Sequence, residues 1–172
     1  MNTKSNWDAS TFFQTLTAQN KLAQQHAFTF CRVSGLNGFQ EALSKMQAKQ
    51  NFVCVSDIAQ GYTSLENSPH TRRVKTVFLA MRYPLDNMAA RQDRMDTMQE
   101  LFRQFMSKLI LEKTHIAENY IYLDERITFN EIDEYFFAGC ACTYFQVAVD
   151  VYTDLRLNEN EWLPAEPHPA TE

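Results

Sequence analysis

The chain has 172 residues, of which 45% are hydrophobic and 22% are charged, and its net charge is −5. This length suits one domain, and the hydrophobic fraction excludes wholesale disorder, collagen and low-complexity proteins. The acidic excess argues against a general nucleic-acid binder, because such proteins are usually basic.

Short segments of the sequence predict the cellular compartment and the redox state of the cysteines. The longest purely apolar run, Val77 to Met81, is far shorter than the roughly 20 residues of a membrane span, so we expect no membrane association. Residues 1–8 contain no apolar stretch of the kind that a signal peptide needs, which favours a cytoplasmic protein. In a reducing cytoplasm the cysteines are expected to be buried free thiols rather than a disulfide framework. They are Cys31, Cys54, Cys140 and Cys142.

The first third of the chain predicts two helices with a strand between them. Residues 8–25 carry apolar side chains near helical spacing, and Asp8 or Ser10 can cap the helix. Residues 27–33 are rich in aromatic and β-branched side chains and predict a strand. After a turn that contains two glycines, residues 38–49 predict a short helix.

The middle of the chain predicts two strands and a long helix. Residues 51–56 are apolar on both faces, which is typical of an interior strand, and residues 57–71 predict a loop or a loose hairpin. Residues 73–85 predict a long strand. Residues 88–113 have apolar side chains that recur every three or four positions, with charged residues between them, and this pattern predicts an amphipathic helix.

The last third predicts further strands and a tail. Residues 121–123 and 127–129 are short and strand-like, and the acidic stretch 131–134 separates them from the long run 136–157. That run alternates with a period of two, and its core face is expected to be the side of Phe145, Val147 and Val149. We expect one domain over residues 1–157 and an acidic, proline-containing tail without strands over residues 158–172.

No motif in the sequence identifies a catalytic residue or a cofactor. The four glycines form neither of the common nucleotide-binding loops, and the four histidines are isolated. Cys140 and Cys142 would share one face of a strand, but they lack the second ligand pair of a structural zinc site, so small buried side chains are the preferred interpretation. We therefore predict no catalytic residue, no cofactor and no metal.

Six carboxylates gather between residues 118 and 134. A solvated acidic edge is the simplest interpretation, a docking surface for a basic partner is a second, and cation binding or acid–base catalysis is a third. They are Glu118, Asp124, Glu125, Glu131, Asp133 and Glu134.

The net charge hides an uneven distribution. Residues 1–70 carry +1, residues 71–113 carry +4 and residues 114–172 carry −10. Two arrangements are open: the charges are neutralised within one folded surface, or they form one basic and one acidic face. The second arrangement suits head-to-tail contact between copies, which closes into a ring when the rotation permits.

The order of elements resembles that of small phage tail-terminator or tail-completion proteins, including prophage-encoded ones. The segments that carry the resemblance are Val77 to Asp86 with the helix after it, Phe137 to Val147, and Asn158 to Trp162. The resemblance covers residues 8–162 in element order and includes no signature motif. It implies an α+β fold with a helix-covered sheet and a ring at the end of a tail tube.

We therefore expect an α+β fold with a single mixed, mainly antiparallel sheet of four to five strands and a long amphipathic helix packed on one face. The predicted function is a non-enzymatic structural protein of a phage tail or tail-like particle, a ring-forming terminator or connector that binds the tube end. Its partners would be copies of itself and other tail or tube proteins, and it would pass from the host cytoplasm into the particle. The predicted subunit interface pairs basic residues of the long helix with acidic residues after it: Arg91, Arg94, Arg103, Asp124, Glu131, Asp133 and Glu134.

Two alternatives remain open at this point. One is a small-ligand- or cation-binding α+β domain, or an enzyme, that uses the carboxylates of residues 118–134. The other is a bacterial adaptor that docks a basic partner through the acidic C-terminal third.

Overall fold

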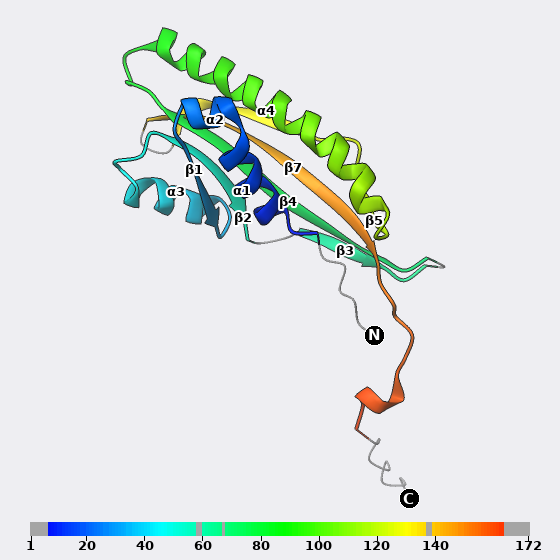
Figure 1. Ribbon diagram of the computed structural model, residues 1–172. Coiled ribbons are helices and arrows are strands. Elements are labelled where there is room, and N and C mark those ends of the chain that lie inside the picture. The colour runs from blue at the N-terminus through cyan, green and yellow to red at the C-terminus, as the bar shows by residue number, and fades with distance from the viewer. Residues whose placement is uncertain (1–6, 58–59, 67, 137–138, 164–172) are drawn as a thin grey trace, which may run out of the picture.

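A computed structural model describes residues 7–57, 60–66, 68–136 and 139–163, with only the backbone described for residues 133–136. Helices and strands alternate along these residues (Figure 1). They are α1 (Ala9–Gln19), α2 (Lys21–Gln25), β1 (Phe28–Val33), α3 (Leu36–Lys45), β2 (Asn51–Ser56), β3 (Gln60–Ser64), β4 (His70–Arg82), α4 (Met88–Ala117), β5 (Ile121–Leu123), β6 (Phe129–Phe136), β7 (Cys140–Tyr152) and the 3₁₀ helix η1 (Glu159–Glu161).

The described strands form one mixed sheet of seven strands in an α+β fold. Its main path is β1-β2-β4-β7-β5, with β3 beside β4 and β6 beside β7. The β1–β2 pair is parallel and the other pairs are antiparallel. The α+β class is confirmed, but the expected count of four to five strands is too low. The structure adds β3 in the segment expected to be a loop or a loose hairpin, and extends β6 over the acidic stretch, because neither polar segment shows a clear strand pattern.

The centre of the sheet is the long antiparallel pair of β4 and β7, which stays in register from His70 opposite Tyr152 to Arg82 opposite Cys140. Successive side chains alternate between the two faces of the sheet. As predicted, Phe145, Val147 and Val149 all lie on the same buried face.

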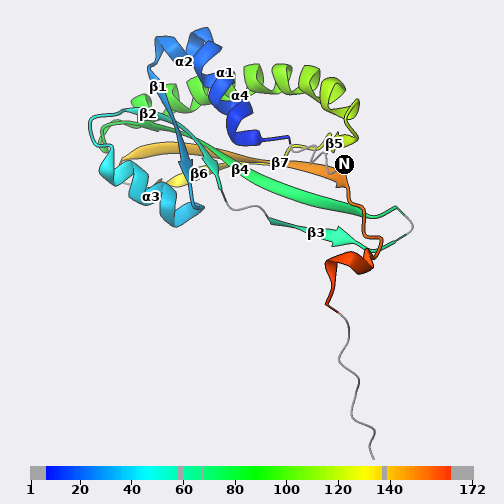
Figure 2. The same cartoon turned by 60° about the horizontal axis from the view of Figure 1, so that its bottom comes forward.

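Three helices cover that face. Figure 2 shows α1, α2 and α4 on one side of the sheet and α3 on the other. Phe13 of α1 contacts Phe105 of α4 and Phe145 of β7, with ring centroids 5.8 and 5.6 Å apart. The predicted helix over residues 88–113 is confirmed and continues to Ala117, because Ile116 adds one more buried side chain to its apolar stripe.

The second face has a smaller core beneath α3. Phe39 and Leu43 of α3 are buried, and the Phe39 ring stacks on Phe78 of β4 at 4.7 Å. Phe52 and Cys142 complete this core from β2 and β7. As predicted, β2 is an interior strand with every residue buried.

The predicted helix over residues 8–25 is two helices. Asp8 caps α1 as expected, accepting hydrogen bonds from the N–H groups of Ser10 and Thr11. Asn20 has an extended backbone (ψ 125°) and its side chain accepts from Ala23 N at 2.8 Å, which begins α2. Asn20 also donates to Gln104 of α4 at 2.7 Å. The break follows from this cap and tertiary contact, which apolar spacing does not reveal.

The acidic stretch 131–134 is strand rather than separator, because it lies within β6. Glu131 and Ile132 pair with β7 and point to opposite faces of the sheet. Gln99 of α4 donates to Glu131 at 2.6 Å, and Ile132 packs on the core beneath α3. Charged side chains are common on edge strands, where one strand edge faces solvent.

The expectation of four free thiols is wrong for one pair. Cys31 and Cys54 lie opposite each other in the parallel β1–β2 pair, with Cα atoms 4.7 Å apart, and form a disulfide. That register brings together two cysteines 23 positions apart, which sequence spacing does not predict. Cys140 and Cys142 are free and buried, and burial raises the pKa of Cys140 to about 11.

No helix among the described residues is both long and apolar enough to cross a membrane.

After β7 the described chain leaves the sheet. Thr153 N donates to Pro69 O at 3.0 Å, and residues 154–163 are exposed. Figures 1 and 2 show this segment running away from the sheet and carrying η1. We call residues 153–163 the C-terminal arm. Its part within 158–163 contains η1, and the rest of the predicted tail lies outside the described residues.

Candidate interaction surface

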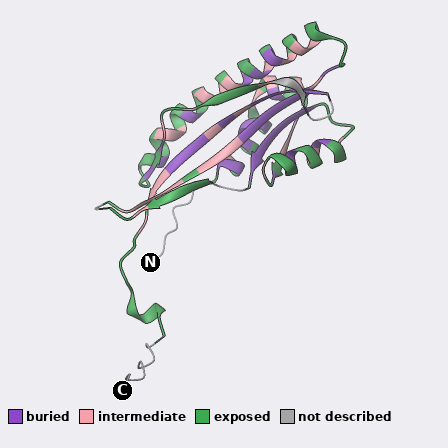
Figure 3. Ribbon diagram, turned by 180° about the vertical axis from the view of Figure 1, so that it is seen from behind, coloured by how far each residue is buried: buried purple, intermediate pink, exposed green. Residues whose placement is uncertain are grey.

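At one end of the sheet, none of the described helices lies over the second face. Figure 3 shows this face, with α3 lying over one end only. Phe78 and Cys142 lie beneath α3, so by alternation Arg72 and Val74 of β4 and Asp150 of β7 share the face beyond it. We call this part, made by β3, β5 and the paired halves of β4 and β7, the uncovered face.

Tyrosines are prominent on the uncovered face. Tyr62 of β3 lies opposite Arg72, and Tyr122 of β5 lies opposite Asp150, so one row of side chains crosses four strands. Tyr152 follows at the end of β7. These three tyrosines are 56%, 55% and 57% exposed. Exposed tyrosines on a rigid sheet are characteristic of surfaces that bind other proteins.

An ion-paired arginine lies in the middle of this row. Arg72 contacts Asp124 and donates to Asp150 Oδ2 at 2.8 Å, and all three side chains are partly exposed. The Arg126 N–H and then the Arg72 guanidinium hold the pKa of Asp124 below its ordinary value. The two carboxylates in turn raise the pKa of Arg72. The row therefore presents aromatic rings around one arginine that is paired with two carboxylates, and Asp150 Oδ1 is buried with no partner among the described residues.

A groove lies between the uncovered face and the first turn of α3. It has a volume of about 610 Å³ and is lined by apolar and uncharged polar side chains. Val74, Phe78 and Tyr144 form its floor on the sheet, and Leu36 and Asn37 of α3 form one wall. Among the described residues that line it, none carries a charged side chain. We call this feature the α3 groove.

The first turn of α3 reaches the groove without a side-chain cap. Its N-cap residue is Gly35, which has φ 94° and so lies in the region that glycine adopts readily. No side chain of the described residues makes a cap hydrogen bond there, whereas Asp8, Asn20 and Asn87 cap the other described α-helices. The first N–H groups of a helix have no partner within the helix, so those of α3 can bond an acceptor outside it.

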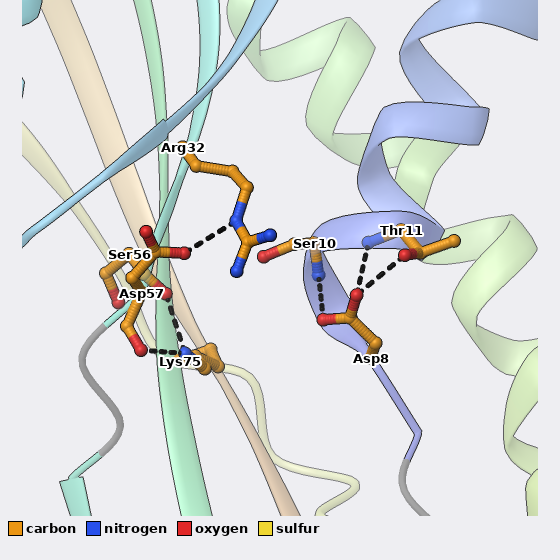
Figure 4. A network of polar contacts seen from close by, with 7 residues as sticks. All are labelled: Asp8, Ser10, Thr11, Arg32, Ser56, Asp57 and Lys75. Carbon is orange, nitrogen blue, oxygen red and sulfur yellow. Dashed lines mark hydrogen bonds and ion pairs between the residues drawn. The ribbon is translucent and has the colours of Figure 1, made fainter.

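A second cluster of polar residues lies on the other face, where α1 begins (Figure 4). Asp8 accepts from Ser10 N at 3.0 Å and from Thr11 Oγ1 at 2.6 Å. Burial acts to raise the pKa of Asp8, but these hydrogen bonds outweigh it and the pKa is lowered. Nearby, Arg32 Nε donates to Asp57 Oδ1 at 2.7 Å.

A lysine completes this cluster. Lys75 Nζ donates to Ser56 O at 2.9 Å and also contacts Asp57 O, and burial lowers the pKa of Lys75. Figure 4 shows Ser10 Oγ pointing toward Arg32, and this buried oxygen has no partner among the described residues. Two cations and two carboxylates balance, and each carboxylate already accepts hydrogen bonds. The bonds of Arg32 and Lys75 therefore join β1 and β4 to the end of β2, and those of Asp8 stay within the start of α1.

The basic residues of the predicted interface have partners within the chain or are partly buried. Arg91 of α4 donates to Ile132 O of β6 at 2.9 Å, and Arg103 pairs with Glu100 on its own helix. Arg94 is half-buried, and its Nε has no partner among the described residues. Of these three arginines, Arg91 therefore contacts β6 and Arg103 contacts its own helix.

The acidic residues of the predicted interface are similarly engaged. Asp124 pairs with Arg72, and Glu131 accepts from Gln99. The side chains of Asp133 and Glu134 lie outside the described residues. Lys113 also pairs with Glu125. Basic and acidic segments therefore meet within one chain, and their charges are partly neutralised there.

The other sequence candidates are dispersed in the structure. Among the described residues, no group of three or more His, Cys, Asp or Glu is placed to hold a metal ion. Asp124 and Glu125 bond different basic partners on β4 and α4. The sequence pattern did not predict the uncovered face or the α3 groove, because each combines residues from several strands. The one available signal was the mixed polar and aromatic alternation in residues 62–76 and 144–152.

No protein-family model matches the sequence, and no curated protein is significantly similar to it.

Proposed function

We propose that the chain is a structural subunit that acts by binding alone and assembles with copies of itself into a ring, as a terminator or connector of a phage tail or tail-like particle. Other tail or tube proteins would bind the same ring. The observation that carries the self-assembly proposal is the uncovered face, where three exposed tyrosines surround an ion-paired arginine on a rigid sheet. Tyrosine and arginine are enriched at protein interfaces.

Two features support the tail assignment. The described elements run from a helix and strand through a long helix to a long final strand, which is the order on which the resemblance to tail terminators rests. Helices cover one face of the sheet, and the other face is partly uncovered. The uncovered part leaves a surface on which a neighbouring subunit can bind.

The mass of the native protein over a concentration series, by light scattering and native mass spectrometry, tests self-assembly. We expect one closed oligomer of defined stoichiometry. Replacing the two tyrosines of the row, Tyr62→Ser with Tyr122→Ser, should weaken association by about tenfold or more, because buried tyrosines often dominate interface energy.

The matched control is Leu111→Ser on α4, since Leu111 is 65% exposed and lies outside the uncovered face. It should leave the oligomer unchanged. A chain that stays monomeric at every concentration contradicts the proposed function. An oligomer sensitive to Leu111→Ser but not to the tyrosine changes would place the interface elsewhere.

A further inference from the structure

The C-terminal arm carries large apolar side chains with no covering surface in its own described chain. Leu157, Trp162 and Leu163 are 72%, 69% and 93% exposed. Several such residues on one short segment are unusual in a monomer, where exposed apolar groups are normally scattered. The arm therefore has the composition of a segment that is buried against another molecule.

The base of the arm is fixed. Thr153 N donates to Pro69 O, and its Oγ1 is 2.7 Å from Thr71 Oγ1. Beyond this anchor the arm points away from its own sheet (Figures 1 and 2). A chain extends at most about 3.5 Å per residue, so the ten residues from Thr153 to Trp162 reach at most roughly 35 Å. The arm can therefore reach a neighbouring molecule.

The α3 groove has complementary properties. Its floor and wall expose Val74, Tyr144 and Leu36 to an incoming side chain. The uncapped first turn of α3 lies at its edge, with the positive end of the helix dipole. The described arm is acidic, with Asp154, Glu159 and Glu161 against the single base Arg156.

We propose that the C-terminal arm of one copy binds the α3 groove of a second copy. Trp162 and Leu163 occupy the groove, and the carboxylates of Glu159 and Glu161 accept hydrogen bonds from the N–H groups of Leu36 and Asn37 at the start of α3. This inference rests on the proposed function, and it specifies one contact through which the proposed self-association occurs.

The contact is heterologous, because the arm and the groove are different surfaces of the chain. Repeating such a contact closes into a ring when the rotation between copies permits. A stable interface uses roughly 20–30 residues a side, so the arm is one part of the contact and the uncovered face is the other.

Cysteine pairs test which surfaces meet. Copies carrying Leu36→Cys are mixed with copies carrying Leu163→Cys under mild oxidation, and the linked peptides are identified by mass spectrometry. We expect a disulfide between residues 36 and 163 of different copies. The control pair, Leu111→Cys with Leu163→Cys, should not cross-link. Formation of a 36–163 disulfide only when both changes are in one chain would overturn docking on a second copy.

Charge at the rim of the groove gives an independent test. Leu36 is 48% exposed at the first position of α3, where Glu favours the helix and Lys opposes it slightly. Leu36→Glu should nevertheless weaken association by repelling the acidic arm, and Leu36→Lys should preserve it. Trp162→Ser should weaken association by about tenfold or more.

The outcomes separate the two proposals. An oligomer that is unaffected by Trp162→Ser and yields no 36–163 cross-link overturns arm docking and leaves the proposed ring standing. A wild-type chain that is monomeric at all concentrations overturns both.

Discussion

At the scale of single residues, Arg72 has the most consequential contacts of the uncovered face. Its guanidinium contacts Asp124 of the β5–β6 loop and Asp150 of β7. It therefore joins a loop to two central strands. Without it the two carboxylates would face each other with no basic partner between them, a like-charge arrangement that destabilises the fold.

We predict that Arg72→Met lowers the free energy of unfolding at pH 7 by about 1–2 kcal/mol, a modest figure because the three side chains are partly exposed. The folded-state pKa of Asp124 lies below its ordinary value of 3.8. The stabilisation is therefore present above that value and is lost as the pH falls through the lowered pKa. Urea denaturation at pH 7 and at lower pH should show the difference between variant and wild type shrinking in acid.

The control for this prediction is Arg156→Met. Arg156 pairs with Asp154 on the exposed arm, and its side chain is 86% exposed. We expect no measurable change in stability, since exposed pairs contribute little. Equal effects of the two substitutions would contradict the role assigned to Arg72.

The cysteines make a second prediction at this scale. Thiol labelling of the native oxidised protein should find no reactive cysteine, because Cys140 and Cys142 are buried and burial raises the pKa of both thiols. Unfolding without a reductant should release two thiols, and unfolding with a reductant should release four. Four thiols without reductant would show that Cys31 and Cys54 are not bonded.

At the scale of elements, α4 illustrates how one helix faces both core and solvent. Its apolar stripe packs on α1 and β7, and its outer face carries Ile110 and Leu111 in solvent. Arg91 and Gln99 also bond the edge strand β6. The helix therefore helps to hold β6, whose acidic residues the sequence pattern places outside any strand.

We predict that Phe105→Ala lowers the free energy of unfolding by about 3–4 kcal/mol, since it leaves a cavity between α1 and β7. Phe105 is 1% exposed. Ile110→Ala, five positions along the same helix and 67% exposed, should change stability by less than about 0.5 kcal/mol. Chemical denaturation of both variants measures the contrast, and similar losses would contradict this orientation of α4.

At the scale of the whole molecule, the described chain consists of a packed body and the C-terminal arm. Residues 154–163 of the arm are all exposed. Removing residues 155–172 should therefore leave the far-UV circular dichroism and the melting temperature of the monomeric body unchanged. A clear drop in melting temperature under monomeric conditions would show that the arm packs on its own chain. The same truncation provides a folded reference for the oligomer measurements.

Sequence periodicity was sufficient to predict the principal helices and strands. The three-and-four spacing of residues 88–113 identified α4, and alternation identified the core face of β7. The apolar run at residues 51–56 identified β2 as interior. These patterns are local, because each depends on which side of one helix or strand is buried.

The pairing of distant segments was decided only in the tertiary structure. The register of β1 against β2 brings Cys31 to Cys54, and the long β4–β7 pair brings Arg72 to Asp150. Short or polar strands such as β3 and β6 form because a neighbouring strand supplies their hydrogen bonds. The uncovered face and the α3 groove depend on where α3 ends over the sheet, which follows from packing between elements and not from periodicity within any one of them.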